Sequence, residues 1–210
     1  TSITLATNNQ TPIKREQLAS LTQFQRSLEQ YYASFPESER IYYERRSKQF
    51  NSDNSIVKAK IITVPYQIKS FAGMFLDEPH NVTSYFGSIV KRLNDGKIPI
   101  FDNEHKYNPY HTSAFAYYKL ESFFRKGLID SSYKKVRFHI LMLFRHLNSN
   151  EVLPQFNSNK IEKYCDKLMD ILIEDDKALE SFKKCIDVID NSGFNKDDKQ
   201  DLKLVSKTKI

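Results

Sequence analysis

Two short polar runs carry the side chains best suited to recognition chemistry. The first, Asn8-Asn9-Gln10, offers amide donors and acceptors just before Thr11 and Pro12, where a helix is expected to begin. Amides at a helix start can contact a base edge or a phosphate. The alternative is structural, because the same amides can cap the helix and tie it to preceding elements. Both interpretations stay open.

The second run is Tyr42-Tyr43-Glu44-Arg45-Arg46. Its rings and guanidinium groups suit phosphate or single-strand contacts. Alternatively, an arginine pairs with Glu44 or another carboxylate and packs on a tyrosine. Adjacent side chains point in different directions, so we expect one arginine to be buried and the other available to a partner. The candidate nucleic-acid or partner-binding residues are Asn8, Asn9, Gln10, Tyr43, Arg45 and Arg46.

No catalytic or metal-binding motif is recognisable. His139 and His146 share a predicted helix, but a zinc pattern such as H-E-x-x-H is absent. So are G-x-S-x-G, phosphate-binding glycine loops, dinucleotide fingerprints and a D…E-x-K nuclease constellation. Asp102 and Glu104 beside His105 are the one place where a small site would fit. We expect no catalytic residues, no metal, no cofactor and no hydrolysis by this chain.

Apolar residues that recur every three or four positions predict a mainly α, bundle-like domain of about seven helices. The segment 97–110 is expected to be an irregular loop, and Tyr85 is expected to face the core. At most one short strand pair is expected, near 1–5 or 56–63, since 56–63 alternates apolar residues with lysine. The predicted helices span 13–32, 64–76, 81–93, 112–126, 133–147, 161–173 and 178–189.

Composition is that of a globular protein with a sizeable core. The 210 residues are 40% hydrophobic and 28% charged, with 15 Phe and 12 Tyr in place of Trp. No apolar run approaches the roughly 20 residues that span a bilayer, so no membrane association is expected. Cys165 and Cys185 stand apart without a C-x-x-C pattern, which favours a reducing, cytoplasmic location.

Charge divides the chain into two predicted units. Residues 1–150 hold 21 basic against 13 acidic side chains, a net charge of +8. Residues 151–210, expected to form a helical hairpin and a polar tail, hold 11 against 13 and carry −2. The basic excess fits an anionic partner, although a pI near 9.1 is also common in lysine-rich proteins that bind none. Because the apolar run Thr1–Ala6 leads straight into the amides, we expect this chain to be the C-terminal part of a longer protein.

The spacing of these motifs resembles that of the abortive infection phage resistance (AIPR) family. The run Thr7–Pro12 is similar to the family's T-N-S-Q-N-type run, and Tyr43-Glu44-Arg45-Arg46 with Gln49 and Phe50 is similar to its Y-E-R-K/R-x-G-x-Y-type run. The chain departs from the family at Ser47-Lys48, where glycine is usual, and at Phe50, where tyrosine is usual. The resemblance covers about residues 1–95, weakens to about 150 and is absent beyond.

The resemblance implies a role in bacterial anti-phage defence, within larger proteins whose N-terminal half resembles restriction endonucleases. Two functions stay open. The chain is either a helical module that engages nucleic acid or supports an upstream nuclease-like domain, or a structural, protein-interaction module without nucleic-acid contact. A small independent enzyme is a third, remoter alternative.

Overall fold

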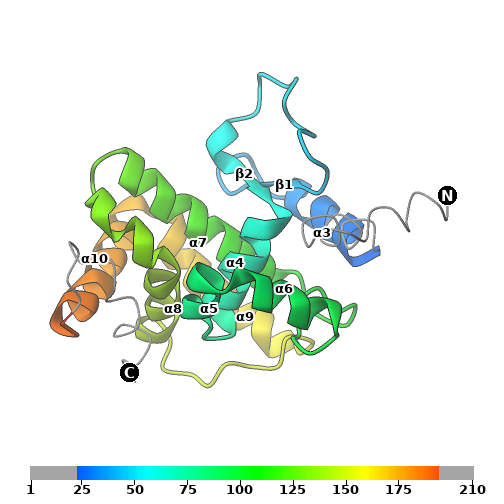
Figure 1. Ribbon diagram of the computed structural model, residues 1–210. Helices are drawn as coiled ribbons and strands as arrows, with labels where there is room; N and C mark the ends of the chain where they lie inside the picture. Colours follow the sequence, from blue (N-terminus) through cyan, green and yellow to red (C-terminus); the bar gives the residue numbers. More distant parts are fainter. Residues whose placement is uncertain (1–22, 194–210) are drawn as a thin grey trace.

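The structure, a computed structural model, describes residues 23–193 and is mainly α-helical, as predicted. The described part holds eight α-helices, two 3-10 helices and one pair of short strands (Figure 1). In chain order these are α3 (Gln23–Ala33), β1 (Tyr42–Glu44), η2 (Lys58–Lys60), β2 (Ile61–Thr63), α4 (Val64–Phe75), α5 (Pro79–Ser84), α6 (Phe86–Asn94), α7 (Asn108–Arg125), η3 (Ser131–Val136), α8 (Arg137–Leu147), α9 (Asn159–Ile173) and α10 (Asp175–Asn191).

Helix α4 lies at the centre and packs on both α7 and α8. A Cβ atom at Gly73 would lie 3.1 Å from the Cβ of Phe138, so the missing side chain permits the close approach of α4 to α8. Helices α9 and α10 pack on the other sides of α7 and α8 (Figure 1). One hydrophobic cluster extends from Phe24 to Ile189. The predicted division at residue 150 stays a prediction.

The prediction of a single helix over 81–93 is wrong. Tyr85 has φ −133° and ψ 40°, which ends α5 and starts α6, and its side chain is 53% exposed instead of facing the core. The Arg92 guanidinium donates to both carboxylate oxygens of Glu78, at 2.6 and 2.7 Å. This bidentate pair joins the start of α5 to α6 and so stabilises the bend between them.

Other predicted element boundaries differ from the observed ones by a few residues. The loop expected to last to residue 110 ends earlier, since α7 begins at Asn108 with Pro109 in its first turn, where proline costs no hydrogen bond. The beginning of the predicted helix 13–32 lies outside the described residues. Arg145 of α8, 4% exposed, donates from Nε to the carbonyl of Met74 at 2.6 Å and so satisfies the end of α4.

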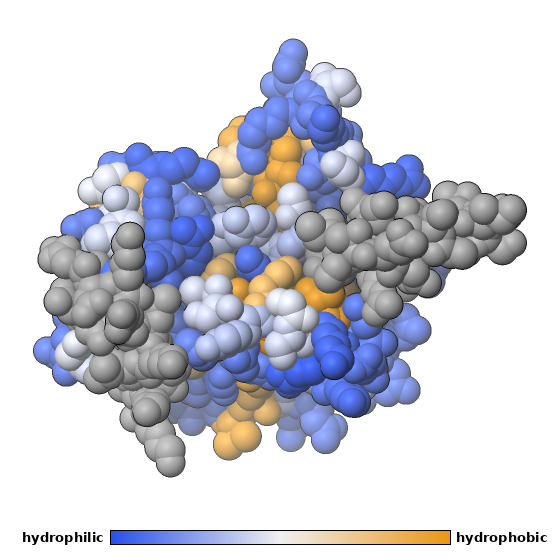
Figure 2. All heavy atoms as spheres, viewed as in Figure 1, coloured by the Kyte–Doolittle hydropathy of each residue, from blue (hydrophilic) through white to orange (hydrophobic). Residues whose placement is uncertain are grey.

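The two strands form a parallel pair, in which Tyr42, Tyr43 and Glu44 lie opposite Ile61, Ile62 and Thr63. The expected strand 56–63 is therefore limited to its last three residues, and the expected strand at 1–5 lies outside the described residues. We call residues 34–63 the lobe. It projects from the helical body beside α3 (Figure 1), and its outer tip is hydrophilic (Figure 2).

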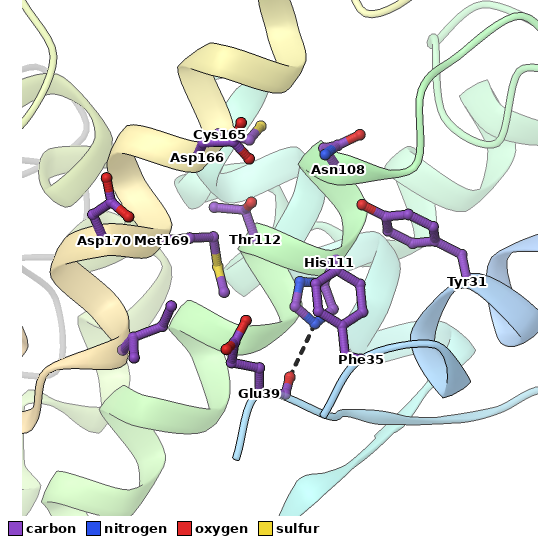
Figure 3. A pocket seen from close by; sticks show the side chains of 11 residues that line it. Tyr31, Phe35, Glu39, Asn108, His111, Thr112, Cys165, Asp166, Met169 and Asp170 are labelled. Atoms are coloured by element: carbon purple, nitrogen blue, oxygen red, sulfur yellow. Dashed lines mark hydrogen bonds between the residues drawn. The ribbon is translucent and has the colours of Figure 1, made fainter. Parts of the chain in front are cut away.

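A cavity of about 250 Å³ lies beside the lobe, where the end of α3 meets α7 and α9 (Figure 3). A second, more open hollow of about 520 Å³ lies between the loop before α7 and the segment that leads into α9. Among residues 23–193, no helix is long and apolar enough to cross a membrane.

Candidate functional site: the charged lobe beside helix α3

Tyr43 is fixed in the interior. In the short strand β1 its side chain points inward and is 1% exposed, with Tyr42 and Glu44 on the other face. Its hydroxyl donates to Oε1 of Gln25 on α3, and its ring packs 5.7 Å from that of Tyr32. Burial raises the pKa of Tyr43 well above its usual value. Tyr43 therefore joins β1 to α3 and offers no open ring face in this structure.

Arg45 extends the same connection. Its Nε donates to Oε2 of Glu29 on α3 at 2.6 Å, and its side chain is only 9% exposed. The amide of Gln49 donates to the other oxygen of Glu29. Glu29 follows Gln25 by one helical turn, so both acceptors lie on the α3 face that meets β1. A partly buried carboxylate thus holds Arg45 and the turn after β1 in place.

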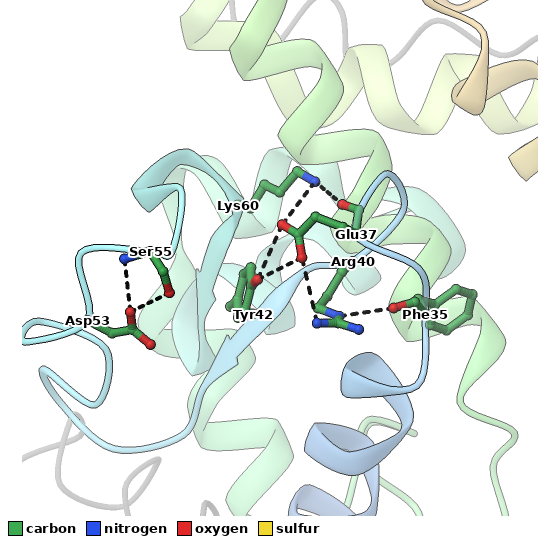
Figure 4. Close-up of polar contacts among 7 residues, drawn as sticks. All are labelled: Phe35, Glu37, Arg40, Tyr42, Asp53, Ser55 and Lys60. Carbon is green, nitrogen blue, oxygen red and sulfur yellow. Dashed lines mark hydrogen bonds and ion pairs between the residues drawn. The ribbon is translucent and has the colours of Figure 1, made fainter.

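A second carboxylate, Glu37, organises the outer side of the lobe (Figure 4). It accepts from the hydroxyl of Tyr42 at 3.1 Å and pairs with Arg40 at 3.6 Å and Lys60 at 3.9 Å. The Lys60 ammonium also donates to the backbone carbonyl of Glu37, and Arg40 donates to that of Phe35. Burial, and then the charge and hydrogen bond of Glu37, raise the pKa of Tyr42.

Arg46 and Lys48 differ from these paired cations. Both side chains are exposed, and neither pairs with a carboxylate of the described residues. The backbone N–H of Arg46 donates to Oε1 of Gln49 at 3.3 Å, which connects this residue to the network around Glu29. The turn after β1 therefore presents two exposed cations on a backbone that neighbouring side chains hold, whereas the exposed Lys58 donates to the backbone carbonyls of Phe50 and Asp53.

The expected difference between the two arginines is present in the geometry, with Arg45 buried against a carboxylate and Arg46 exposed. Whether Tyr43, Arg45 or Arg46 binds a partner stays a prediction, and Asn8, Asn9 and Gln10 lie outside the described residues. Sequence reasoning missed Glu29 and Glu37, the two carboxylates that organise the lobe. The spacing of Glu29 from Gln25 was the available signal for the first, whereas Glu37 meets Lys60 only in the folded chain.

The alternative small site at Asp102, Glu104 and His105 is only partly assembled. All three residues line the larger hollow, but both carboxylates are exposed. His105 Nδ1 lies 2.9 Å from the hydroxyl of Tyr110, and burial lowers the pKa of His105. Among residues 23–193, no group of three or more His, Cys, Asp and Glu side chains is placed to hold a metal ion. That the chain hydrolyses nothing stays a prediction.

Fold and lobe together define a helical module whose small parallel strand pair is joined to α3 by the Tyr43–Gln25 hydrogen bond and the adjacent Arg45–Glu29 ion pair. A family model described as AIPR protein matches residues 1–191, so the chain belongs to the AIPR protein family. The match extends well past residue 150, where the resemblance of the motifs was expected to end, and so includes α9 and α10. Family membership suggests a role in abortive infection and phage defence. Neither the curated proteins nor the solved structures that were searched include a match.

Proposed function

We propose that this chain is the non-catalytic helical portion of a bacterial abortive-infection protein and that its lobe contacts the phosphates of a nucleic acid. The observation that carries this proposal is the exposed pair Arg46 and Lys48, which no described carboxylate neutralises. Guanidinium and ammonium groups in such a position are suited to phosphate oxygens. The hydrogen bonds of Arg45 and Gln49 with Glu29 restrain the turn that carries Arg46 and Lys48. This restraint lowers the entropic cost of binding a ligand there.

The proposal also includes a cellular location and a partner domain. The chain acts in the cytoplasm, where a phage genome and its transcripts are present, and supports an upstream, nuclease-like domain of the same protein. It contributes no catalytic group and no metal, so cleavage belongs to that upstream domain.

The second candidate is a structural, protein-interaction module without nucleic-acid contact. One observation favours it: Tyr43 and Arg45, two of the residues best suited to stacking and phosphate binding, form internal contacts with Gln25 and Glu29. Residues used in this way stabilise the lobe and leave fewer groups for a ligand.

A salt titration separates the two candidates. Affinity of the purified chain for single- and double-stranded DNA and RNA is measured at several salt concentrations, together with that of Arg46→Ala/Lys48→Ala. The control is Lys160→Ala/Lys163→Ala, which removes two exposed lysines of α9 outside the lobe. Each phosphate contact contributes roughly 0.9 to the slope of log K against log salt for duplex DNA and roughly 0.7 for single strands.

If the lobe contacts phosphates, its double variant lowers both affinity and slope, while the α9 double variant leaves them near those of the unmodified chain. Equal behaviour of the two double variants would contradict the assignment to the lobe. Absence of any salt-dependent binding would favour the structural candidate.

A further inference from the structure

The cavity beside the lobe has acidic and aromatic walls and an unusual charge balance. Glu39 contributes from the segment after α3, and Asp166 and Asp170 contribute from α9 (Figure 3). The two aspartates are four residues apart on one helix, so they project from the same face. Of the described residues, none forms an ion pair with any of these three carboxylates. Lys106 pairs with Glu162 at 3.1 Å and Lys167 pairs with Glu151, so neither of these lysines neutralises the three carboxylates.

Asp166 and Asp170 therefore repel each other, and no ion pair among the described residues compensates for this repulsion. Burial, followed by the charges of Asp170 and Glu162, raises the pKa of Asp166. Burial and the neighbouring Cys165, Asp166 and Glu162 likewise raise the pKa of Tyr31, to about 12. A cation in the cavity would offset the contribution that neighbouring negative charges make to both shifts.

His111 supplies an independent observation. Its side chain is 1% exposed, and its Nε2 lies 3.0 Å from the backbone carbonyl oxygen of Glu39, to which it must donate. This bond fixes the tautomer, so Nδ1 is a bare acceptor. Nδ1 has no partner among the described residues, and Figure 3 shows it on the side of the ring away from the Glu39 carbonyl. On the cavity wall this acceptor can take a hydrogen bond from a ligand or from water.

The aromatic walls add a second attraction for a cation. The ring of Phe35 is stacked on His111 with centroids 3.7 Å apart and an interplanar angle of 6°. Tyr31 meets Phe35 edge to face at 5.1 Å. Aromatic faces beside carboxylates stabilise ammonium groups through the ring quadrupole. Burial keeps His111 neutral by lowering its pKa to about 4, so it adds no positive charge.

The same residues are poorly suited to a metal ion. No group of three or more His, Cys, Asp and Glu side chains in the described ranges has the spacing that a metal requires. Burial raises the pKa of the Cys165 thiol to about 12, so it remains protonated and is a poor ligand. The cavity therefore suits an organic cation with N–H donors.

We propose that this cavity binds the primary ammonium group of an alkylamine. The N–H groups would donate to Asp166, Asp170 and Nδ1 of His111, and the alkyl chain would lie along Met169, which also lines the cavity. This inference concerns a different site from the nucleic-acid proposal and does not depend on it.

Isothermal titration calorimetry on the full 210-residue chain tests the inference. The ligands are 1,5-diaminopentane and pentylamine, with neutral 1-pentanol as the matched control of equal length. N-acetyl-lysine methylamide distinguishes the source of the ammonium group: its binding points to a lysine of a polypeptide, and its failure beside bound diamine points to a free amine. Either result supports the ammonium site.

Variants locate the binding. Asp166→Asn/Asp170→Asn should weaken amine binding at least roughly tenfold, because two charge-assisted hydrogen bonds are lost. Both aspartates are exposed residues of α9, so the variant is expected to fold, and its thermal unfolding without ligand verifies this. The matched control is Asp176→Asn, an exposed carboxylate of α10 outside the cavity, which should bind as the unmodified chain does.

Three results would overturn the proposal: equal binding of pentanol and pentylamine, unchanged binding by the double variant, or no amine binding at millimolar concentration. None of them bears on the nucleic-acid titration, in which different residues are replaced. Loss of salt-dependent nucleic-acid binding would in turn leave amine binding unaffected.

Discussion

The junction of the lobe with α3 and the neighbouring cavity use carboxylates in opposite ways, although they lie side by side. Glu29 of α3 accepts from Arg45 and Gln49 of the lobe, and within the lobe Glu37 accepts from Tyr42 and pairs with Arg40 and Lys60. Around the cavity, Asp166 and Asp170 of α9 and Glu39 of the lobe have no cationic partner among residues 23–193.

This difference separates charges that stabilise the fold from charges that are available to a ligand. Ion-paired carboxylates, whether partly buried as Glu29 is or exposed as Glu37 is, position the backbone and hold neighbouring elements together. Unpaired carboxylates that face one another raise the free energy of the empty protein, and a bound cation recovers that cost. We therefore expect the same chemical change to have opposite effects in the two regions.

Acid should have the largest effect, and it acts on the helical body because the lobe contains no histidine. Burial lowers the pKa of both His111 and His139 to about 4 from an ordinary 6.5. The unfolded chain therefore binds more protons between these values. Stability is complete above about pH 6.5 and is lost as the pH falls toward 4, by about 3 kcal/mol for each histidine. Urea unfolding at pH 7 and pH 4.5 measures this loss.

His139→Leu provides the control for that experiment. Both ring nitrogens of His139 are buried without a hydrogen-bond partner, so leucine should not reduce the free energy of unfolding at neutral pH. It should also remove about half of the acid-induced loss. An unchanged loss would show that other groups cause it.

The second-largest effect is a loss of stability when the lobe is detached from Glu29. Arg45→Ala should lower the free energy of unfolding by about 2 kcal/mol, because it removes the ion pair with Glu29 and the packing of a 9% exposed side chain. Arg46→Ala is the matched control, since its side chain is exposed, and should change the same quantity by less than about 0.5 kcal/mol. Denaturant unfolding of both variants measures the difference. Equal losses would contradict the distinct roles of the two arginines.

The smallest effect tests the comparison most directly. Asp166→Asn should raise the free energy of unfolding by a few tenths of a kcal/mol, because repulsion from Asp170 and Glu162 is removed at a largely solvated position. Glu29→Gln, the same carboxylate-to-amide change on α3 where it meets the lobe, should lower it by about 1 kcal/mol, since Arg45 loses its ion pair.

Thermal unfolding of these two variants at low and moderate salt gives the signs, and the benefit of Asp166→Asn should shrink as salt screens the repulsion. Equal signs would show that the two regions do not differ as described.

The sequence alone predicted most of the helices because each buries a stripe of apolar residues that recur at helical spacing. The most apolar of them, expected over 133–147, contains α8, and the segment from Ile68 to Leu76 supplies the core face of α4. It also predicted that Arg45 and Arg46 would differ, since neighbouring side chains diverge in any regular backbone. These features depend on short stretches of chain.

Tertiary structure decided the features that join distant residues. The bend at Tyr85 is stabilised by the pair of Glu78 with Arg92, and the parallel register joins strands separated by 16 residues. The cavity unites Tyr31, His111 and Asp170, which are up to 139 positions apart. No local pattern specifies which charges meet after folding. Whether a carboxylate finds a cation, as Glu29 does, or faces another carboxylate, as Asp166 does, is therefore determined by packing.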